Sequence, residues 1–175
     1  GTMGARITGL GVPLTTLEIR GPVPTPRATL RLVREVRRLG PGLVQGWMYH
    51  GNLAALVAGW VTSQRPPVVW SIRYTPNQLT LEKRSTAAAI RLGAFLSRRV
   101  ARIVYNSRAG AARHAQLGYA TGGDVVIPNG FDTEHFAPSR DARVVWRRRL
   151  GLSVSPVLVG RIGGYHQMKD YPAFL

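Results

Sequence analysis

Short β-branched runs alternate with helical patterns between residues 29 and 127, and this alternation constrains the fold more than any other feature of the chain. Strands are expected at 43–45, 68–72, 102–105 and 124–127, and helices at 29–39, 52–63, 83–99 and 107–117. The run at 68–72 is apolar enough for the centre of a parallel sheet. Strands that alternate with helices through short connections form parallel βαβ units, so the sequence predicts a doubly wound α/β layer.

The stretch from Ile127 to Pro138, I-P-N-G-F-D-T-E-H-F-A-P, lies between this region and the rest of the chain. Pro128 ends the preceding strand because proline has no N–H to donate to a sheet. Asn129-Gly130 tolerates positive φ, so a sharp turn is expected there. The Asp132 carboxylate is expected to accept from backbone N–H groups two or three residues further on. By itself such a stretch is either an ordinary surface turn or a rigid crossing between domains.

Further elements flank these two regions. A helical tail is expected at 1–11 and a strand at 14–19, and beyond the crossing a basic helix at 141–150 and a strand at 157–160 that opens a second sheet. Phe131 and Phe136 are expected to bury their rings against one domain or both. The sequence therefore predicts an incomplete domain at 1–136 and the beginning of a second Rossmann-like domain at 137–175.

The formal charge of +16 is high, and it arises from 24 basic and eight acidic residues. Such a charge attracts nucleic acid, anionic lipid or phosphorylated ligands. The basic residues are scattered, however, and no helix-turn-helix, zinc-finger or RNP-like pattern accompanies them, so nucleic acid is the less favoured partner. With no cysteine, the chain has neither a disulfide nor a thiolate metal site, and a cytoplasmic protein is the default expectation.

Several motifs occur in one order along the chain: Q-G-W-M-Y-H-G-N at 45–52, V-V-W-S-I-R at 68–73, I-V-Y-N-S at 103–107, the crossing itself, and G-R-I-G-G-Y-H-Q-M-K-D-Y at 160–171. This set resembles the GT-B glycosyltransferases of the large retaining family 4. The resemblance implies a nucleotide-sugar donor, a sugar or lipid-linked acceptor, and no metal or other cofactor. A sugar-nucleotide epimerase shares the GT-B architecture, but it gives no reason for the N-G-F-D string.

Polar side chains follow the ends of the expected strands, where the loops and helix N-termini of a parallel sheet converge. His50 and Asn52 follow the strand at 43–45, Arg73 ends the strand at 68–72, and Ser107 follows the third strand. His50 either donates to a sugar or phosphate or is satisfied by a backbone carbonyl, and Arg73 either binds an anionic ligand or pairs with a carboxylate of the protein. Ser107, like Asn106, is mainly a helix cap. Trp47 and Tyr49 either stack on a sugar ring or pack in the core.

In the family that the chain resembles, an Arg and a Lys after the first strand of the second domain hold the donor pyrophosphate, and Arg161 and Lys169 are the candidates here. Gly164 stands where relatives carry that Arg. The family's Gly-rich donor loop and its E-x7-E glutamates are expected to lie outside these 175 residues. We therefore expect the chain alone to have little or no transferase activity.

Two alternatives remain open. The chain is either an enzyme of this family or a basic module that binds nucleic acid or an anionic membrane without catalysis. Arg84, Arg91 and Arg98 recur every seven residues along the helix at 83–99, so one helix face is strongly basic. That face is either solvated or lies against anionic lipid, where it would bring the protein to a lipid-linked acceptor at the inner side of a membrane.

Overall fold

The computed structural model describes residues 2–19, 25–153, 155–164 and 170–174. The chain forms two compact units, Gly1–Asn129 and Gly130–Leu175. The boundary between them in the chain falls within the stretch from Ile127 to Pro138. The domain division after residue 136 stays a prediction. Each unit is described by itself below.

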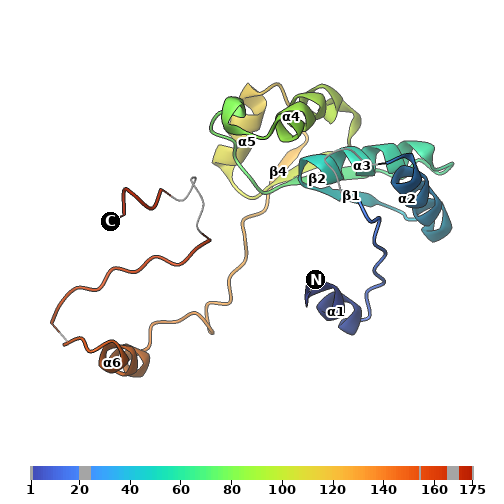
Figure 1. Ribbon diagram of the computed structural model, residues 1–175. Coiled ribbons are helices and arrows are strands. Elements are labelled where there is room, and N and C mark those ends of the chain that lie inside the picture. The colour runs from blue at the N-terminus through green and yellow to red at the C-terminus, as the bar shows by residue number, and fades with distance from the viewer. Residues whose placement is uncertain (1, 20–24, 154, 165–169, 175) are drawn as a thin grey trace. The chain divides into compact units, whose positions relative to one another are not determined.

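The first unit contains one four-stranded sheet with the order β1-β2-β3-β4. Its strands are Val44–Trp47, Val68–Ile72, Arg102–Tyr105 and Asp124–Val126, and all three pairings are parallel. Figure 1 shows helices α3 (Met48–Val61), α4 (Arg84–Leu96) and α5 (Arg108–Gln116) on the same side of this sheet. Right-handed crossovers between strands in sequential order require this arrangement. The predicted parallel α/β layer is confirmed.

The helix ends follow the caps expected from the sequence. Helix α2 covers Pro26–Leu39, with the Thr25 hydroxyl accepting from the Ala28 N–H, and it ends at Gly40 in the left-handed region. Ser107 caps α5 in the same way. A short helix, α1, covers Thr2–Gly9, where a helical tail was predicted. Two 3-10 turns precede and follow α4: η1 (Leu79–Leu81) and η2 (Ser97–Arg99).

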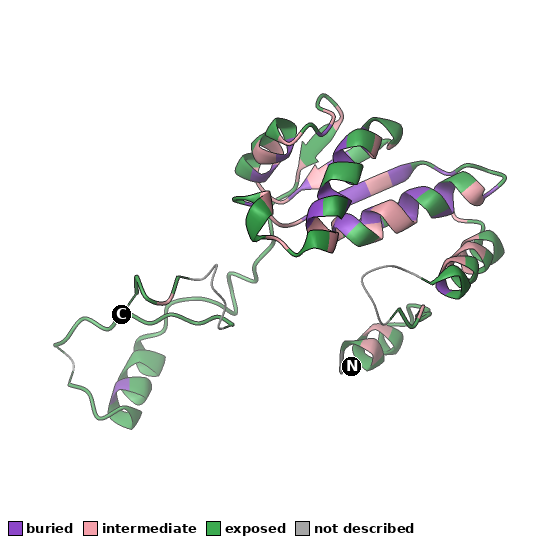
Figure 2. Cartoon of the chain, turned by 45° about the horizontal axis from the view of Figure 1, so that its top comes forward, coloured by how far each residue is buried: buried purple, intermediate pink, exposed green. Residues whose placement is uncertain are grey.

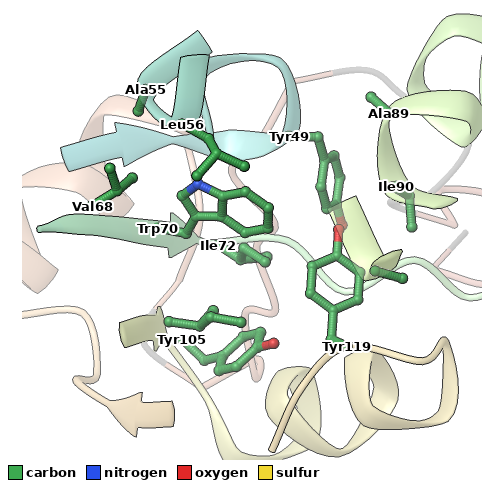
Figure 3. Packing of buried hydrophobic residues seen from close by; sticks show 12 residues of the cluster. Tyr49, Ala55, Leu56, Val68, Trp70, Ile72, Ala89, Ile90, Tyr105 and Tyr119 are labelled. Carbon is green, nitrogen blue, oxygen red and sulfur yellow. The ribbon is translucent and has the colours of Figure 1, made fainter. Parts of the chain in front are cut away.

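The core lies between the sheet and the three connecting helices. Trp70, in the middle of β2, is fully buried beneath Leu56 of α3, and its ring meets Tyr119 edge-on at 6.5 Å between centroids (Figure 3). Ile90 of α4 and Ile103 of β3 complete the centre of the cluster. Burial of these large side chains provides most of the driving force that holds the helices on the sheet.

Helix α3 approaches β1 and β2 unusually closely. A Cβ at Gly46 would lie 2.5 Å from the Cα of Asn52, and a Cβ at Gly59 would lie 2.5 Å from a methyl of Val68. The sheet-facing side of α3 therefore consists mainly of small residues. The sequence spacing predicts one buried apolar face made of Leu53, Leu56, Val57, Trp60 and Val61. This prediction is partly wrong, because Val57 and Trp60 are 39% and 46% exposed while Ala55 and Ala58 are buried. The glycines at 46 and 51 also predict a turn over 46–51 after the first strand, and this prediction is wrong, since α3 begins directly after β1.

Three other predictions of local structure were wrong. Residues 14–19 and 157–160 form no strand, because neither segment pairs with a neighbouring strand among the described residues. The turn lies at 133–136 instead of Asn129-Gly130, where the Phe136 N–H donates to the Asp132 carbonyl and the Asp132 carboxylate accepts from the His135 N–H as expected. Phe131 and Phe136 are 78% and 74% exposed, so neither residue is buried among the residues that the structure describes.

The second unit contains helix α6, Arg140–Arg149, capped by Ser139. Its one buried residue is Arg147, whose guanidinium donates to the carbonyls of Ser153 and Pro156 and so fixes the segment that follows the helix. Figure 2 shows that most other described residues of this unit are exposed. Across the described part of the chain, no helix combines the length and apolarity that a membrane crossing requires.

The close contact between β1 and α3 leads to a direct test. Gly46→Ala places a methyl group against the backbone of Asn52, which cannot move without displacing the helix, so we expect a loss of about 1–3 kcal/mol or more in the free energy of unfolding. Gly51→Ala is the matched control, because no atom lies within 4 Å of its Cβ position and alanine favours a helix by about 1 kcal/mol over glycine. Equal midpoints in urea denaturation for the two variants would contradict the packing described here.

Candidate functional site

The junction of β1 and α3 forms one side of the candidate site. Met48 joins the two elements with a φ of 61°, a region that non-glycine residues occupy at a cost, and such strain is often found at functional sites. Trp47 precedes the helix without capping it by a side-chain hydrogen bond. The first turn of α3 therefore presents backbone N–H groups and the positive end of the helix dipole at the carboxyl end of β1. His50 lies exposed on this turn.

Arg73 follows the end of β2 and is held at several points. Its guanidinium donates to the Asn129 side-chain oxygen at 2.6 Å and lies over the Trp47 ring, 5.2 Å from the centroid. Its backbone N–H points at the Met48 sulfur, and its carbonyl oxygen lies 3.5 Å from the Asn106 amide nitrogen. Because Asn129 and Trp47 hold the side chain and Met48 and Asn106 contact its backbone, Arg73 loses little further freedom when a ligand binds.

The charge of Arg73 is not neutralised within the described part of the chain. The ion pairs found there join Arg31 to Glu18 and Arg38 to Glu35, and Arg73 has an amide as its partner. Among the described residues, Arg73 therefore forms no ion pair with an acidic residue, which was the structural alternative for this side chain. Because a guanidinium carries five N–H donors, it can still bind an anionic group in bidentate geometry.

The third strand adds polar groups to the same edge. Asn106 and Ser107 follow β3, and both side chains are half-buried. The Ser107 hydroxyl accepts from the Gly110 N–H at 3.0 Å, which confirms its role as a helix cap. A Cβ at Gly110 would lie 3.1 Å from the hydroxyls of both Ser107 and Thr75, so this part of the edge is tightly packed.

The structure brings some of the predicted site residues together and separates others. Arg73 lies beside Trp47, whose ring is 58% exposed, whereas Tyr49 is buried in the core. Asn52 lies buried beneath the surface, and neither atom of its carboxamide has a hydrogen-bond partner among the described residues. The contact of Asn129 with Arg73 was not expected from the sequence, although the position of Asn129 directly after the fourth strand was a signal for it.

In the second unit, Arg161 is exposed and its guanidinium donates to the Asp170 carbonyl at 3.0 Å while lying over the Tyr171 ring. The Tyr171 hydroxyl in turn donates to the Gly163 carbonyl. These contacts bring Arg161 and Gly163 close to Asp170 and Tyr171. Lys169 lies outside the described residues.

Behind the candidate site, a buried hydrogen-bonded pair ties α3 to α5. Nδ1 of His114 lies 2.8 Å from the Gly110 carbonyl oxygen, which can only accept, so this nitrogen carries the proton. Nε2 then accepts from the Tyr49 hydroxyl at 3.0 Å. Burial lowers the pKa of His114 and raises the pKa of Tyr49, so both groups are neutral near pH 7.

A cavity described in the first unit lies away from these residues. It has a volume of about 570 Å³ and is lined by Arg37, Trp60 and the segment 62–66, where α3 ends and β2 begins. None of the candidate residues at the carboxyl edge of the sheet lines this cavity. The chemistry of that edge comes from Arg73 and its neighbours.

Comparison with known proteins decides the family. The model of Glycosyltransferase Family 4 matches residues 6–135, which include the whole sheet and every candidate residue of the first unit. The chain belongs to this family. No curated protein matches it.

Three solved structures have a fold similar to that of this chain. Crystal structures of Anabaena Alr3699/HepE in complex with UDP and glucose, with UDP, and with UDP-glucose match with TM-scores of 0.67, 0.69 and 0.66. Sequence identity is 17%, 18% and 19%, and each match covers 86% of this chain. The chain spans 40% of the length of these proteins. The Rossmann-like fold of GT-B glycosyltransferases, predicted from the sequence, is thereby confirmed.

The buried His114 predicts a pH dependence of stability. Its pKa is lower in the folded protein than the ordinary value of about 6.5 in the unfolded chain, so below that pH the unfolded chain binds a proton that the folded protein does not. We expect the free energy of unfolding to fall from about pH 7 to about pH 5.5, by at most about 1.4 kcal/mol per pH unit.

His114→Gln should flatten this dependence, because the titrating ring is removed. His50→Gln, at an exposed position, should leave it as in the parent. Urea denaturation at several pH values measures all three proteins. A parent-like slope in His114→Gln would show that another group causes the effect.

Proposed function

We propose that the chain is part of a retaining glycosyltransferase that transfers a hexose from a UDP-sugar to a sugar or lipid-linked acceptor in the synthesis of envelope polysaccharide. Family membership and a fold shared with a protein crystallised with UDP and UDP-glucose support the proposal. The observation that carries it is the guanidinium of Arg73, held at the ligand-binding edge of the sheet without a carboxylate partner among the described residues.

Arg73 supplies positive charge for the reaction. As the glycosidic bond to the nucleotide breaks, negative charge develops on the leaving phosphate, and a fixed donor aimed at that charge lowers the barrier. Asn129 and Trp47 hold the guanidinium in place before the substrate arrives, so little reorganisation is needed. The uncapped N-terminus of α3 adds a second source of positive potential at the same edge.

His50 and Trp47 fit the acceptor side. The His50 imidazole lies exposed on the first turn of α3, where it can donate to a hydroxyl of the sugar. The accessible part of the Trp47 ring offers an apolar surface on which a pyranose can pack. Arg161 and Lys169 are proposed to bind the donor pyrophosphate from the second unit, with Asn52 and Ser107 as weaker candidates.

In this proposal cationic side chains meet the phosphate charge, so the reaction needs no divalent metal and no other cofactor. The whole enzyme would accordingly keep its activity in a chelator. The 175 residues alone would turn over little or no donor.

The decisive variant is Arg73→Lys in the full reading frame that contains this chain. Lysine keeps the charge but lacks the planar fork and the stacking on Trp47, so we expect kcat/KM to fall roughly 10–100-fold. The assay measures nucleotide release from UDP-glucose and a panel of other UDP- and GDP-sugars, with and without a lipid-linked acceptor.

Arg34→Lys is the matched control, because Arg34 is exposed on α2, and it should keep parental activity. Thermal unfolding of both variants separates lost activity from lost stability. Parental kinetics in Arg73→Lys would remove Arg73 from the mechanism. A protein that consumes none of the nucleotide sugars would contradict the proposed transferase activity itself.

A further inference from the structure

The outer face of α4 combines basic and apolar side chains. Arg84, Arg91 and Phe95 are seven and four residues apart, so they lie in one row along the helix. Leu92 lies beside this row, and the Phe95 and Leu92 side chains are 73% and 49% exposed. The opposite side of α4 packs against the core through Ala87, Ile90 and Ala94. Phe95 therefore projects from the same side of the helix as Arg84 and Arg91.

The segment around this helix carries charge of one sign only. Residues 83–102 contain six basic side chains and no acidic one: Lys83, Arg84, Arg91, Arg98, Arg99 and Arg102. The arginines of α2 differ, because two of them have carboxylate neighbours. None of the arginines from 84 to 99 pairs with a carboxylate among the described residues, and all of them are exposed.

Trp60 extends the same surface onto the neighbouring helix. It lies near the end of α3, is 46% exposed, and carries the Arg99 guanidinium over its ring at 5.5 Å from the centroid. Helices α3 and α4 pack against each other on one side of the sheet (Figure 1). Tryptophan beside arginine is the combination found where proteins meet the headgroup level of a bilayer.

We propose that this surface, the α4 face, docks the protein on an anionic lipid bilayer. The α4 face consists of Trp60, Arg84, Arg91, Leu92, Phe95, Arg98 and Arg99. The arginines attract the anionic headgroups, and Leu92 and Phe95 enter the boundary between the headgroups and the acyl chains. The docking is peripheral and reversible, since a single short helix face supplies it.

The apolar side chains favour lipid over nucleic acid as the partner. A surface that binds a phosphate backbone needs arginine or lysine and polar donors, and it gains little from an exposed leucine. Insertion of Phe95 and Leu92 into lipid removes apolar area from water, which the phosphate backbone of a nucleic acid does not do.

Co-sedimentation of the chain with vesicles tests the proposal. We expect binding to phosphatidylcholine vesicles that contain phosphatidylglycerol, and little binding to vesicles of phosphatidylcholine alone. Arg91→Gln combined with Arg98→Gln should weaken the partition coefficient about 30-fold at low salt, and this difference should shrink as salt is added. Phe95→Ser should weaken it about tenfold at any salt concentration, because it removes the inserted ring.

The matched control is Arg34→Gln combined with Arg108→Gln, which removes the same charge from two exposed positions on other helices. It should keep most of the binding, and circular dichroism verifies that every variant is folded. If the control variant binds vesicles as weakly as the Arg91 and Arg98 variant, binding depends on the total charge of the protein and not on the α4 face, and the proposal is overturned. Three other results would also overturn the proposal. The first is a Phe95→Ser variant that binds vesicles as tightly as the parent, and the second is equal binding of the parent to both kinds of vesicle. The third is an Arg91 and Arg98 variant that loses binding to an oligonucleotide but keeps its binding to vesicles.

Discussion

The close contact between Gly46 and Asn52 determines most of what this chain presents to a ligand. Because β1 and α3 approach to the distance that only glycine allows, the helix starts immediately after the strand, with Met48 in a left-handed conformation. The first turn of α3 is thereby placed at the edge of the sheet. Trp47 and His50 lie exposed at this junction, and Arg73 reaches the Trp47 ring from the neighbouring strand. A longer connection would separate these side chains.

Charge is distributed unevenly over the first unit, and the distribution matters more than the total of +16. Some arginines are bound within the fold: Arg37 donates to the Val61 carbonyl, and Arg113 donates to the carbonyls of Pro76 and Asn77. Arg73 and Arg99 of the α4 face are different, because Arg73 contacts the Trp47 ring and the Asn129 amide, and Arg99 lies over the Trp60 ring. These are the positions where an external anion gains most, since no carboxylate of the described chain competes for the guanidinium.

The sequence predicted the parallel layer well, because the strands are short runs with apolar residues and several of the helices have a recognisable cap. Thr25, Gly40 and Ser107 all act as their residue types suggest. The predicted strand at 14–19 was wrong because a strand-like sequence pattern does not show whether a partner strand lies beside it. The predicted start of α3 was wrong because glycine at position 46 suggests a turn in the sequence, whereas in the structure Gly46 is where the strand contacts the helix.

The candidate site was predictable in outline only. The rule that ligands gather at the carboxyl ends of parallel strands pointed to Arg73 and His50, and both follow the carboxyl end of a strand in the structure. It did not show that Asn129 binds Arg73, because that contact joins residues 56 positions apart in the chain. Nor did it show that Asn52 is buried, since burial at the start of α3 depends on the close approach to β1.

The central claim is that anionic substrate binds at this edge, beside Trp47 and Arg73. Its most direct test is the effect of UDP-glucose on the indole N–H signals in NMR spectra of the full reading frame. Trp47 should shift, whereas Trp60 at the far end of α3 and Trp70 in the core should stay unchanged. Unchanged Trp47 with a shifted Trp60, or no shift at saturating donor, would contradict the account.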